Sequence, residues 1–312
     1  MSEIDDRLLQ QMESFAIQLA SHAGEILLED FGTDLRVEFK DRHRGDPVTK
    51  ADRESQEYLR EAIQREYPDH GILGEEDLAL EPKGCRILWV LDPLDGTKNF
   101  LNGLPIYGVS VGALDEGRPV VGAISLPAMA DSLKQGSGIR GQGSGGTKSP
   151  GQRTDRAIFH ARQGGGAFLG ISRISVAPGD GPRRDQLVTL PANFFRHWRF
   201  GGRLKKEGGE VRSTGSTVYE LAYTACGTFY YAVFGGPKIW DVAAGILLVK
   251  EANGEALIKD RRTWRPFTSF DLDGKRQSRD LKGLREWRVP LIVGSPNAAR
   301  LVASSIRRRL LP

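Results

Sequence analysis

Two aspartates at the end of an apolar segment place the strongest constraint on this chain. Residues 85–97 read CRILWVLDPLDGT, so Asp92 and Asp95 directly follow a run that predicts a buried strand. Carboxylates are costly to bury unless a cation neutralises them, and hard divalent metals prefer oxygen ligands. The segment therefore indicates either a metal site or an ordinary pair of Asp-Pro and Asp-Gly turns.

Three further acidic segments bear on this choice. They read DPVTKAD at 46–52, GEED at 74–77 and WDVAAG at 240–245. Each has a plain structural explanation, namely a capping box made by Thr49 and Asp52, a solvated acidic loop, and a helix N-cap at Asp241. The joint pattern is harder to explain in this way, and it favours the metal site.

The ordered set DPVTKAD, GEE, DPLDGT and WDVAAG resembles the inositol monophosphatase family, over roughly residues 8–305. That family contains magnesium-dependent phosphatases that act on inositol monophosphates, fructose bisphosphate and 3′-phosphoadenosine phosphates. The resemblance implies an α/β fold, a layered α+β sandwich in which helix and sheet layers alternate. It also implies two or three Mg²⁺ ions, a small phosphorylated substrate and, as in many members, a homodimer.

The resemblance assigns metal ligands to the matching positions of this sequence. Glu75 would bind a metal and Asp92 would bridge two of them. Leu94 would contribute its backbone carbonyl, and Asp95 would hold the second metal together with Asp241. Phosphoryl transfer depends on positioning and charge neutralisation, which agrees with a site made of acids without a Cys or His nucleophile.

Catalytic and substrate-binding roles follow from the same resemblance. The catalytic set comprises Asp52, Glu75 and Thr97, with Thr97 orienting a metal-activated water and Asp52 aiding it. Backbone N–H groups at the start of the helix after Asp95 would cradle the phosphate, which agrees with the affinity of helix N-termini for anions. The RSTGS motif at 212–216 resembles the lining of the family's leaving-group pocket. The implied substrate-binding residues are Leu94, Asp95, Gly96, Thr97, Gly215, Ser216 and Asp241.

One position departs from the inositol-specific members of the family. Those members carry an acid that contacts the inositol ring seven residues before the Trp-Asp aspartate, where this chain has Phe234. An aromatic ring cannot accept hydrogen bonds from inositol hydroxyls. A 3′(2′),5′-bisphosphate nucleotidase acting on 3′-phosphoadenosine 5′-phosphate therefore stays open as an alternative to a polyol or sugar phosphatase.

The chain predicts two α/β halves around a Gly/Ser-rich insert. Residues 1–133 form the half with most metal ligands, 134–156 a flexible insert, and 157–312 the half with Asp241 and the leaving-group pocket. The insert contains GxGxxG matches, but no strand precedes them and no helix follows, so we expect no dinucleotide site. Helices are expected at 5–31, 49–67, 218–226, 242–252 and 297–310, and strands at 85–91, 107–114, 119–126, 228–234, 255–258 and 290–293.

Charge and composition indicate which binding partners and which cellular compartment to expect. The net charge of +4 on 312 residues is a weak field, and we do not expect nucleic acid as a partner. One stretch, 183–206, nevertheless mixes basic and aromatic residues, so a non-catalytic protein that contacts RNA remains an alternative. The plainer interpretation is that its aromatic side chains pack inward. The acidic N-terminus, two cysteines and lack of a long apolar run predict a cytoplasmic protein without a membrane span.

Overall fold

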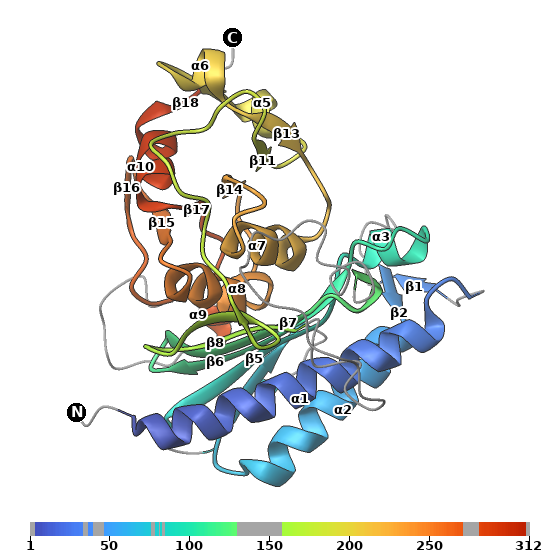
Figure 1. Ribbon diagram of the computed structural model, residues 1–312. Helices are drawn as coiled ribbons and strands as arrows, with labels where there is room; N and C mark the ends of the chain where they lie inside the picture. Colours follow the sequence, from blue (N-terminus) through green and yellow to red (C-terminus); the bar gives the residue numbers. More distant parts are fainter. Residues whose placement is uncertain are drawn as a thin grey trace.

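The computed structural model describes residues 4–33, 37–39, 47–75, 79–80, 82, 85–129, 158–270 and 281–309. Within these ranges helices and sheets alternate in layers, as the sequence predicts (Figure 1). The insert expected at 134–156 and Asp46 of the first acidic motif lie outside the described residues.

Two long helices form the first layer. Helix α1 (Asp6–Asp30) and helix α2 (Lys50–Glu66) lie side by side and pack on one face of the first sheet. The buried face of α1 includes Met12, Ala16 and Leu19, which recur at the spacing that brings side chains to one side of a helix. Both helices match their predicted ranges to within a residue or two.

The first sheet has eight strands in the order β10-β9-β8-β7-β6-β5-β3-β4. Neighbouring strands are antiparallel except β3 and β5, which are parallel. The strands predicted at 107–114 and 119–126 form an antiparallel hairpin, β6 and β7. Because β8, β9 and β10 follow residue 157, the sheet is assembled from both sides of the 134–156 segment. The strands are β3 (Gly71–Gly74), β4 (Ala79–Leu80), β5 (Ile87–Asp95), β6 (Gly108–Asp115), β7 (Arg118–Ser125), β8 (Ile158–Arg162), β9 (Gly166–Leu169) and β10 (Ser172–Arg173).

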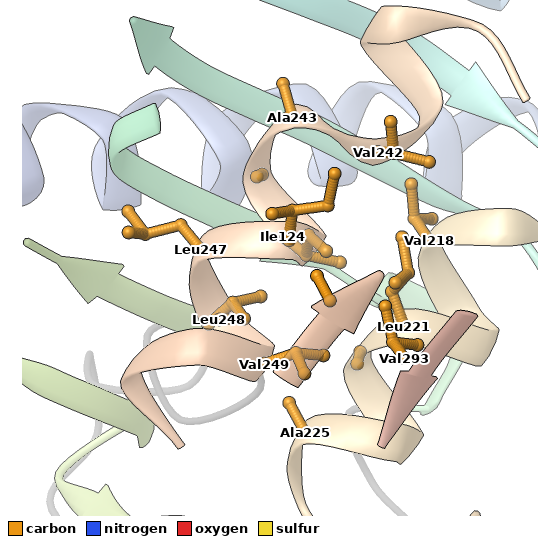
Figure 2. Close-up of a cluster of buried hydrophobic side chains, with 14 of the residues drawn as sticks. Ile124, Val218, Leu221, Ala225, Val242, Ala243, Leu247, Leu248, Val249 and Val293 are labelled. Carbon is orange, nitrogen blue, oxygen red and sulfur yellow. The ribbon is translucent and has the colours of Figure 1, made fainter. Parts of the chain in front are cut away.

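Helices α7 (Thr217–Ala225) and α8 (Ile239–Glu251) fill the middle layer. Figure 2 shows their apolar side chains in one cluster with Ile124 of the first sheet and Val293 of the second. Helix α8 approaches β6 and β7 closely because glycines face it. A Cβ atom at Gly122 would lie 2.9 Å from the Ala244 backbone, closer than real Cβ atoms come.

The second sheet has the strand order β13-β11-β14-β17-β15-β16. Helix α10 (Pro296–Ser305) packs on it and forms a further layer. The strands are β11 (Leu187–Thr189), β13 (Glu210–Arg212), β14 (Tyr231–Phe234), β15 (Glu255–Asp260), β16 (Thr263–Pro266) and β17 (Leu291–Gly294). Short elements complete the fold: β1 (Val37–Phe39), β2 (Pro47–Thr49), α3 (Thr97–Leu101), η1 (Pro127–Met129), α5 (Phe194–His197), β12 (Trp198–Phe200), α6 (Leu204–Glu207), α9 (Leu281–Arg285) and β18 (Ile306–Arg308).

The last predicted helix is too long at its C-terminal end. Instead of continuing to 310, the helix ends at Ser305, and residues 306–308 form strand β18, which pairs antiparallel with β12. Pairing with a strand about a hundred residues earlier in the chain leaves no local pattern in the sequence, so helical periodicity alone predicts too long a helix.

Two simpler observations concern cysteines and membranes. Cys85 and Cys226 are both buried thiols. In the part of the chain that the structure describes, no helix is long and apolar enough to cross a bilayer.

Candidate metal centre

The end of strand β5 delivers the first two acids. The strand is buried along its whole length and continues through Asp92 to Asp95, four residues beyond its predicted end. Its pairing with β6 shifts register between these two aspartates, where Pro93 interrupts the ladder. The backbone N–H of Leu94 donates to Asp92 Oδ1 at 3.1 Å, which fixes the turn between the acids.

Helix α7 fixes the carboxylate of Asp95 from the other half of the chain. The Ser216 hydroxyl donates to Asp95 Oδ1, and the backbone N–H groups of Thr217 and Val218 donate to the same carboxylate at 3.2 and 3.4 Å. These donors lie at the first turn of α7, where backbone N–H groups have no partner within the helix. Asp95 is therefore held in one orientation by residues that lie more than a hundred positions away.

Helix α8 brings the third acid, Asp241, into the same place. The helix begins at Ile239, three residues before its predicted start, and its N-cap is Lys238, so the expected N-cap at Asp241 is wrong. Asp241 lies within the first turn, where its Oδ2 accepts a hydrogen bond from the Lys238 backbone N–H at 2.7 Å. The small residues of the WDVAAG motif allow close packing. They are Ala243, Ala244 and Gly245. Ala243 and Ala244 lie against the glycines of β6 and β7, and a Cβ at Gly245 would lie 2.5 Å from Leu221. Small residues thus let α8 approach the sheet that carries the other acids.

The three aspartates form one cluster. Carboxylate oxygens of Asp92, Asp95 and Asp241 all lie within 4.8 Å of one another. Asp92 and Asp95 are buried and Asp241 is half-buried. A set of hard oxygen donors at this spacing fits a divalent cation such as Mg²⁺ or Ca²⁺.

The electrostatics of the cluster favour a bound cation. Burial raises the pKa of the Asp92 carboxyl well above its usual value, and the negative charges of Glu75 and Asp95 raise it further. Burial and the charge of Asp241 likewise raise the pKa of Asp95, against the lowering effect of the Ser216 hydrogen bond. Burial raises the pKa of Asp241 to about 7. Without a cation, these groups repel each other and hold protons.

Glu75 lies beside the cluster and contacts a lysine. Its Oε1 is 3.6 Å from Lys238 Nζ, and Glu75 is not among the three acids whose oxygens lie within 4.8 Å. Arg285 of helix α9 donates to the backbone carbonyls of Gly74 and Glu75 at 3.1 and 2.9 Å. The loop that carries Glu75 is therefore held against α8 and α9 by cations.

Thr97 is the first residue of α3, and Asp52 lies in the first turn of α2. The Thr97 hydroxyl donates to the Leu94 carbonyl at 3.0 Å. The backbone N–H and hydroxyl of Thr49 both donate to Asp52 Oδ2, at 2.7 and 2.6 Å, and complete the predicted capping box. The charge of Asp52 also contributes to the raised pKa of Asp92, after the larger effects of burial and of the nearer acids.

Gly96 and Gly215 are the glycines that directly precede Thr97 and Ser216. Gly96 has a φ of 86°, and a Cβ there would lie 2.9 Å from the Ile106 carbonyl oxygen, so only glycine fits. Gly215 has a φ of 79° and lies next to the side chain of Asn99. Asn99 Nδ2 donates to the carbonyls of Ile106 and Thr214, at 2.8 Å each, and so joins the two loops.

Three residues near the site were missed by sequence reasoning. Asn99 bridges the loops, Glu220 accepts from the backbone and hydroxyl of Thr214 at 2.9 Å each, and Lys238 contacts Glu75. Burial raises the pKa of Glu220, while its hydrogen bonds from Thr214 lower it. Asn99, two residues after the DPLDGT motif, and Lys238, two residues before the WDVAAG motif, lie near enough to a motif to be noticed.

Phe234 has little free surface in this structure. It is 6% exposed, belongs to the main hydrophobic core, and sits opposite Leu291 in the β14–β17 ladder. It supplies no hydrogen-bond acceptor for a sugar hydroxyl. Because the ring is packed in the core, it also offers little surface on which a nucleotide base could stack.

Comparison with known proteins identifies the family of this chain. The family model described as "Inositol monophosphatase family" matches residues 8–278. The chain belongs to this family. A fructose-1,6-bisphosphatase/inositol-1-monophosphatase of Aquifex aeolicus is 33% identical over 74% of this chain and 79% of its own. The Nus factor SuhB of Pasteurella multocida is 32% identical over 79% of this chain and 84% of its own.

Solved structures show the same fold. An inositol monophosphatase from Anabaena sp. superposes with a TM-score of 0.67 at 25% identity, covering 95% of this chain and 97% of its own. The Thermotoga maritima IMPase gives a TM-score of 0.66 at 24% identity and covers 96% of each chain. The fold and family expected from the four acidic motifs are thus confirmed. Family membership supports phosphatase chemistry, and the acidic cluster offers the oxygen donors that Mg²⁺ prefers.

Proposed function

We propose that this protein is a Mg²⁺-dependent phosphomonoester hydrolase that acts on a small phosphorylated polyol or sugar. One observation supports this proposal most strongly. Carboxylate oxygens from two distant parts of the chain lie within 4.8 Å of one another, and they belong to Asp92, Asp95 and Asp241. A protein without a cation to bind would gain stability by losing these buried charges. Family membership supports phosphate ester hydrolysis as the use of that cation.

The three aspartates would hold the ions, with Glu75 and the Leu94 carbonyl as further ligands. When bound, Mg²⁺ offsets the charge of phosphate oxygens and lowers the pKa of coordinated water. Ser216 and the first turn of α7 keep Asp95 oriented for this role. The residues of the chain thus supply fixed positions, which is what phosphoryl transfer requires.

Residues beside the ligands would position the water and the substrate. The Thr97 hydroxyl is already oriented by the Leu94 carbonyl, and it can accept a hydrogen bond from the attacking water. Asp52, fixed by Thr49, would support this arrangement electrostatically. The loops around Gly96 and Gly215 would admit the phosphate and the leaving group because they lack side chains.

The substrate is tested with a panel. Phosphate release with Mg²⁺ should be measured for inositol 1-phosphate, fructose 1,6-bisphosphate and 3′-phosphoadenosine 5′-phosphate. We expect the highest kcat/KM for one of the first two, and loss of release in Asp241→Asn. Asp69→Asn, an exposed acid outside the site, is the matched control and should keep full activity.

Each outcome of the panel has a defined meaning. Preference for the phosphoadenosine substrate would replace the polyol phosphatase with the bisphosphate nucleotidase. Absence of Mg²⁺-dependent release from all three would contradict the hydrolase proposal and favour a non-catalytic protein on this fold.

A further inference from the structure

A second charged region lies at the end of the molecule where α5, α6 and β18 gather, on the far side of the second sheet from α1 and α2 (Figure 1). We call it the basic end. Its members are exposed Lys and Arg side chains that come from two distant segments of the chain. They are Arg196, Arg199, Lys205, Lys206, Arg307, Arg308 and Arg309.

The pairing of β12 with β18 creates the basic end. Arg199 stands directly opposite Arg307, and the next rungs join Trp198 to Arg308 and Phe200 to Ile306. Like charges opposite each other in an antiparallel pair destabilise the sheet. Arg307 also lowers the pKa of Lys259, after the larger effect of burial on that lysine. The fold thus concentrates positive charge here at a cost in stability.

Nearby acids form their ion pairs with cations outside the basic end. Asp185, Glu207 and Glu210 each form an ion pair, with Arg183, Arg203 and Arg212. Among the residues that the structure describes, no acidic side chain forms an ion pair with a member of the basic end. The local acids are therefore paired with other arginines, and the basic end retains a net positive charge.

The aromatic side chains of the same region divide into two groups. Phe194 is buried, and Trp198 and Phe200 are half-buried, so most of the stretch packs inward, in agreement with the plainer interpretation of the sequence. Phe195 differs, because it is 49% exposed while its ring meets those of Phe194 and Phe200 edge-on at 5.1 and 6.0 Å. A supported, exposed ring among cations is the arrangement on which unpaired bases stack.

We propose that the basic end is a binding surface for single-stranded nucleic acid, separate from the metal centre. Guanidinium groups outnumber ammonium groups in it, and their planar donor forks match phosphate oxygens. The opposed pair Arg199 and Arg307 would contact the phosphodiester backbone, and Phe195 would stack on a base. RNA and DNA share this chemistry, and the experiment separates them.

The test is fluorescence anisotropy with the full chain and labelled oligonucleotides of about 16 nucleotides, as RNA, as DNA and as a duplex. Titrations at salt concentrations from about 50 to about 200 mM give the number of phosphate contacts from the slope of log K against log salt. We expect single-stranded RNA or DNA to bind with a Kd on the order of 1–100 μM, weakening as salt rises.

Three variants test the geometry. Arg199→Gln/Arg307→Gln should weaken binding about tenfold or more at low salt and reduce the slope by about 1.4, since each single-strand phosphate contact contributes about 0.7. Phe195→Ala should weaken binding about fivefold or more and leave the slope unchanged. Arg118→Gln/Arg173→Gln removes the same charge from exposed positions in the first sheet and should leave binding unchanged.

Fold and independence from the metal centre are checked in the same samples. Neutralising the opposed arginines should leave Tm unchanged or raised, and phosphate release should equal that of the wild type in all three variants. Equal weakening in the Arg118/Arg173 control would overturn the proposal, as would failure to bind both single strands. Duplex binding as tight as single-strand binding, with no effect of Phe195→Ala, would also overturn it. So would binding to phosphatidylserine vesicles without binding to either strand.

Discussion

Lys238 Nζ lies 3.6 Å from Glu75 Oε1, so a cation of the protein contacts an acid that the family resemblance assigns to a metal. Lys238 also lowers the pKa of Asp241 by its charge, although burial raises that pKa overall. Its ammonium group lies 5.0 Å from the centre of the Trp240 ring. Lys238 is therefore placed to neutralise the site when no metal is bound, and to oppose a metal at Glu75.

Replacing this lysine should strengthen metal binding. In Lys238→Met, Glu75 loses a competing cation, and we expect Mg²⁺ to bind about 2- to 10-fold more tightly, an effect kept small by the partial exposure of the lysine. The metal-free form should have a lower Tm because Glu75 loses its counter-charge. Calorimetric titration with Mg²⁺ measures the affinity, and Lys250→Met, at the other end of α8, is the matched control. Weaker Mg²⁺ binding in Lys238→Met would show that the lysine supports the metal site.

The stabilising effect of Mg²⁺ should increase with pH. The folded-state pKa of Asp241 is raised from 3.8 to about 7, so its contribution to stability is fully present below about pH 4 and lost as pH rises through about 7. Metal binding requires these carboxyls to lose their protons. Thermal unfolding with and without saturating Mg²⁺, from about pH 5 to about pH 8, should show a growing difference in Tm. A difference independent of pH would mean that the aspartates are already ionised in the metal-free protein.

Asp92→Asn separates folding from catalysis. The amide keeps the volume and is neutral without binding a proton, so it avoids the cost of a carboxyl buried beside Glu75 and Asp95, and the Tm of the metal-free protein should rise by about 2–6 °C. Stabilisation by Mg²⁺ and turnover should both be lost, with kcat falling about 10³-fold or more. Thermal unfolding and phosphate release measure the two effects. A variant with normal Mg²⁺ affinity and activity would remove Asp92 from the site.

Thr97 should affect turnover more than metal binding. Its hydroxyl donates a hydrogen bond to the Leu94 carbonyl and is not a principal metal ligand. We therefore expect Thr97→Ala to bind Mg²⁺ almost normally, while its kcat falls by about 10²-fold. Thr97→Ser keeps the hydroxyl and should recover much of the rate. Steady-state kinetics at saturating Mg²⁺ measure both. An unchanged kcat in Thr97→Ala would exclude the residue from water positioning.

The close approach of α8 to β7 should be sensitive to a single methyl group. In Gly122→Ala the new Cβ would lie 2.9 Å from the Ala244 backbone, and we expect a loss of about 1–3 kcal/mol in the free energy of unfolding. Because the strain displaces α8, Mg²⁺ affinity should fall as well. Gly235→Ala, where the nearest atom is 3.8 Å away, is the control for denaturant unfolding and titration. Equal stability of both variants would show that α8 can shift without cost.

The sequence predicts those features that depend on neighbouring residues. Amphipathic spacing locates α1 and α2, and the Thr49–Asp52 capping box forms as its spacing requires. The family resemblance, carried by four acidic motifs, links Asp92 and Asp95 to Asp241 from the amino-acid sequence alone. Periodicity cannot make that link, because these residues meet only through the packing of α7 and α8 between two sheets.

Features that depend on distant contacts are not predictable in this way. Three contacts at the site join segments that are far apart in the chain. They are the hydrogen bond from Ser216 to Asp95, the hydrogen bond from Asn99 to the Thr214 carbonyl, and the ion pair of Lys238 with Glu75. The strand at 306–308 falls within a predicted helix because its partner, β12, lies elsewhere in the sequence. The same pairing produces the basic end, which the weak net charge of the whole chain conceals.

The most direct test of the metal centre is an anomalous difference map from crystals grown with saturating Mn²⁺, which prefers the same oxygen ligands as Mg²⁺. The account predicts peaks about 2.0–2.3 Å from carboxylate oxygens of Asp92, Asp95 and Asp241. Crystals of protein that releases phosphate, with no peak between these three residues, would contradict it.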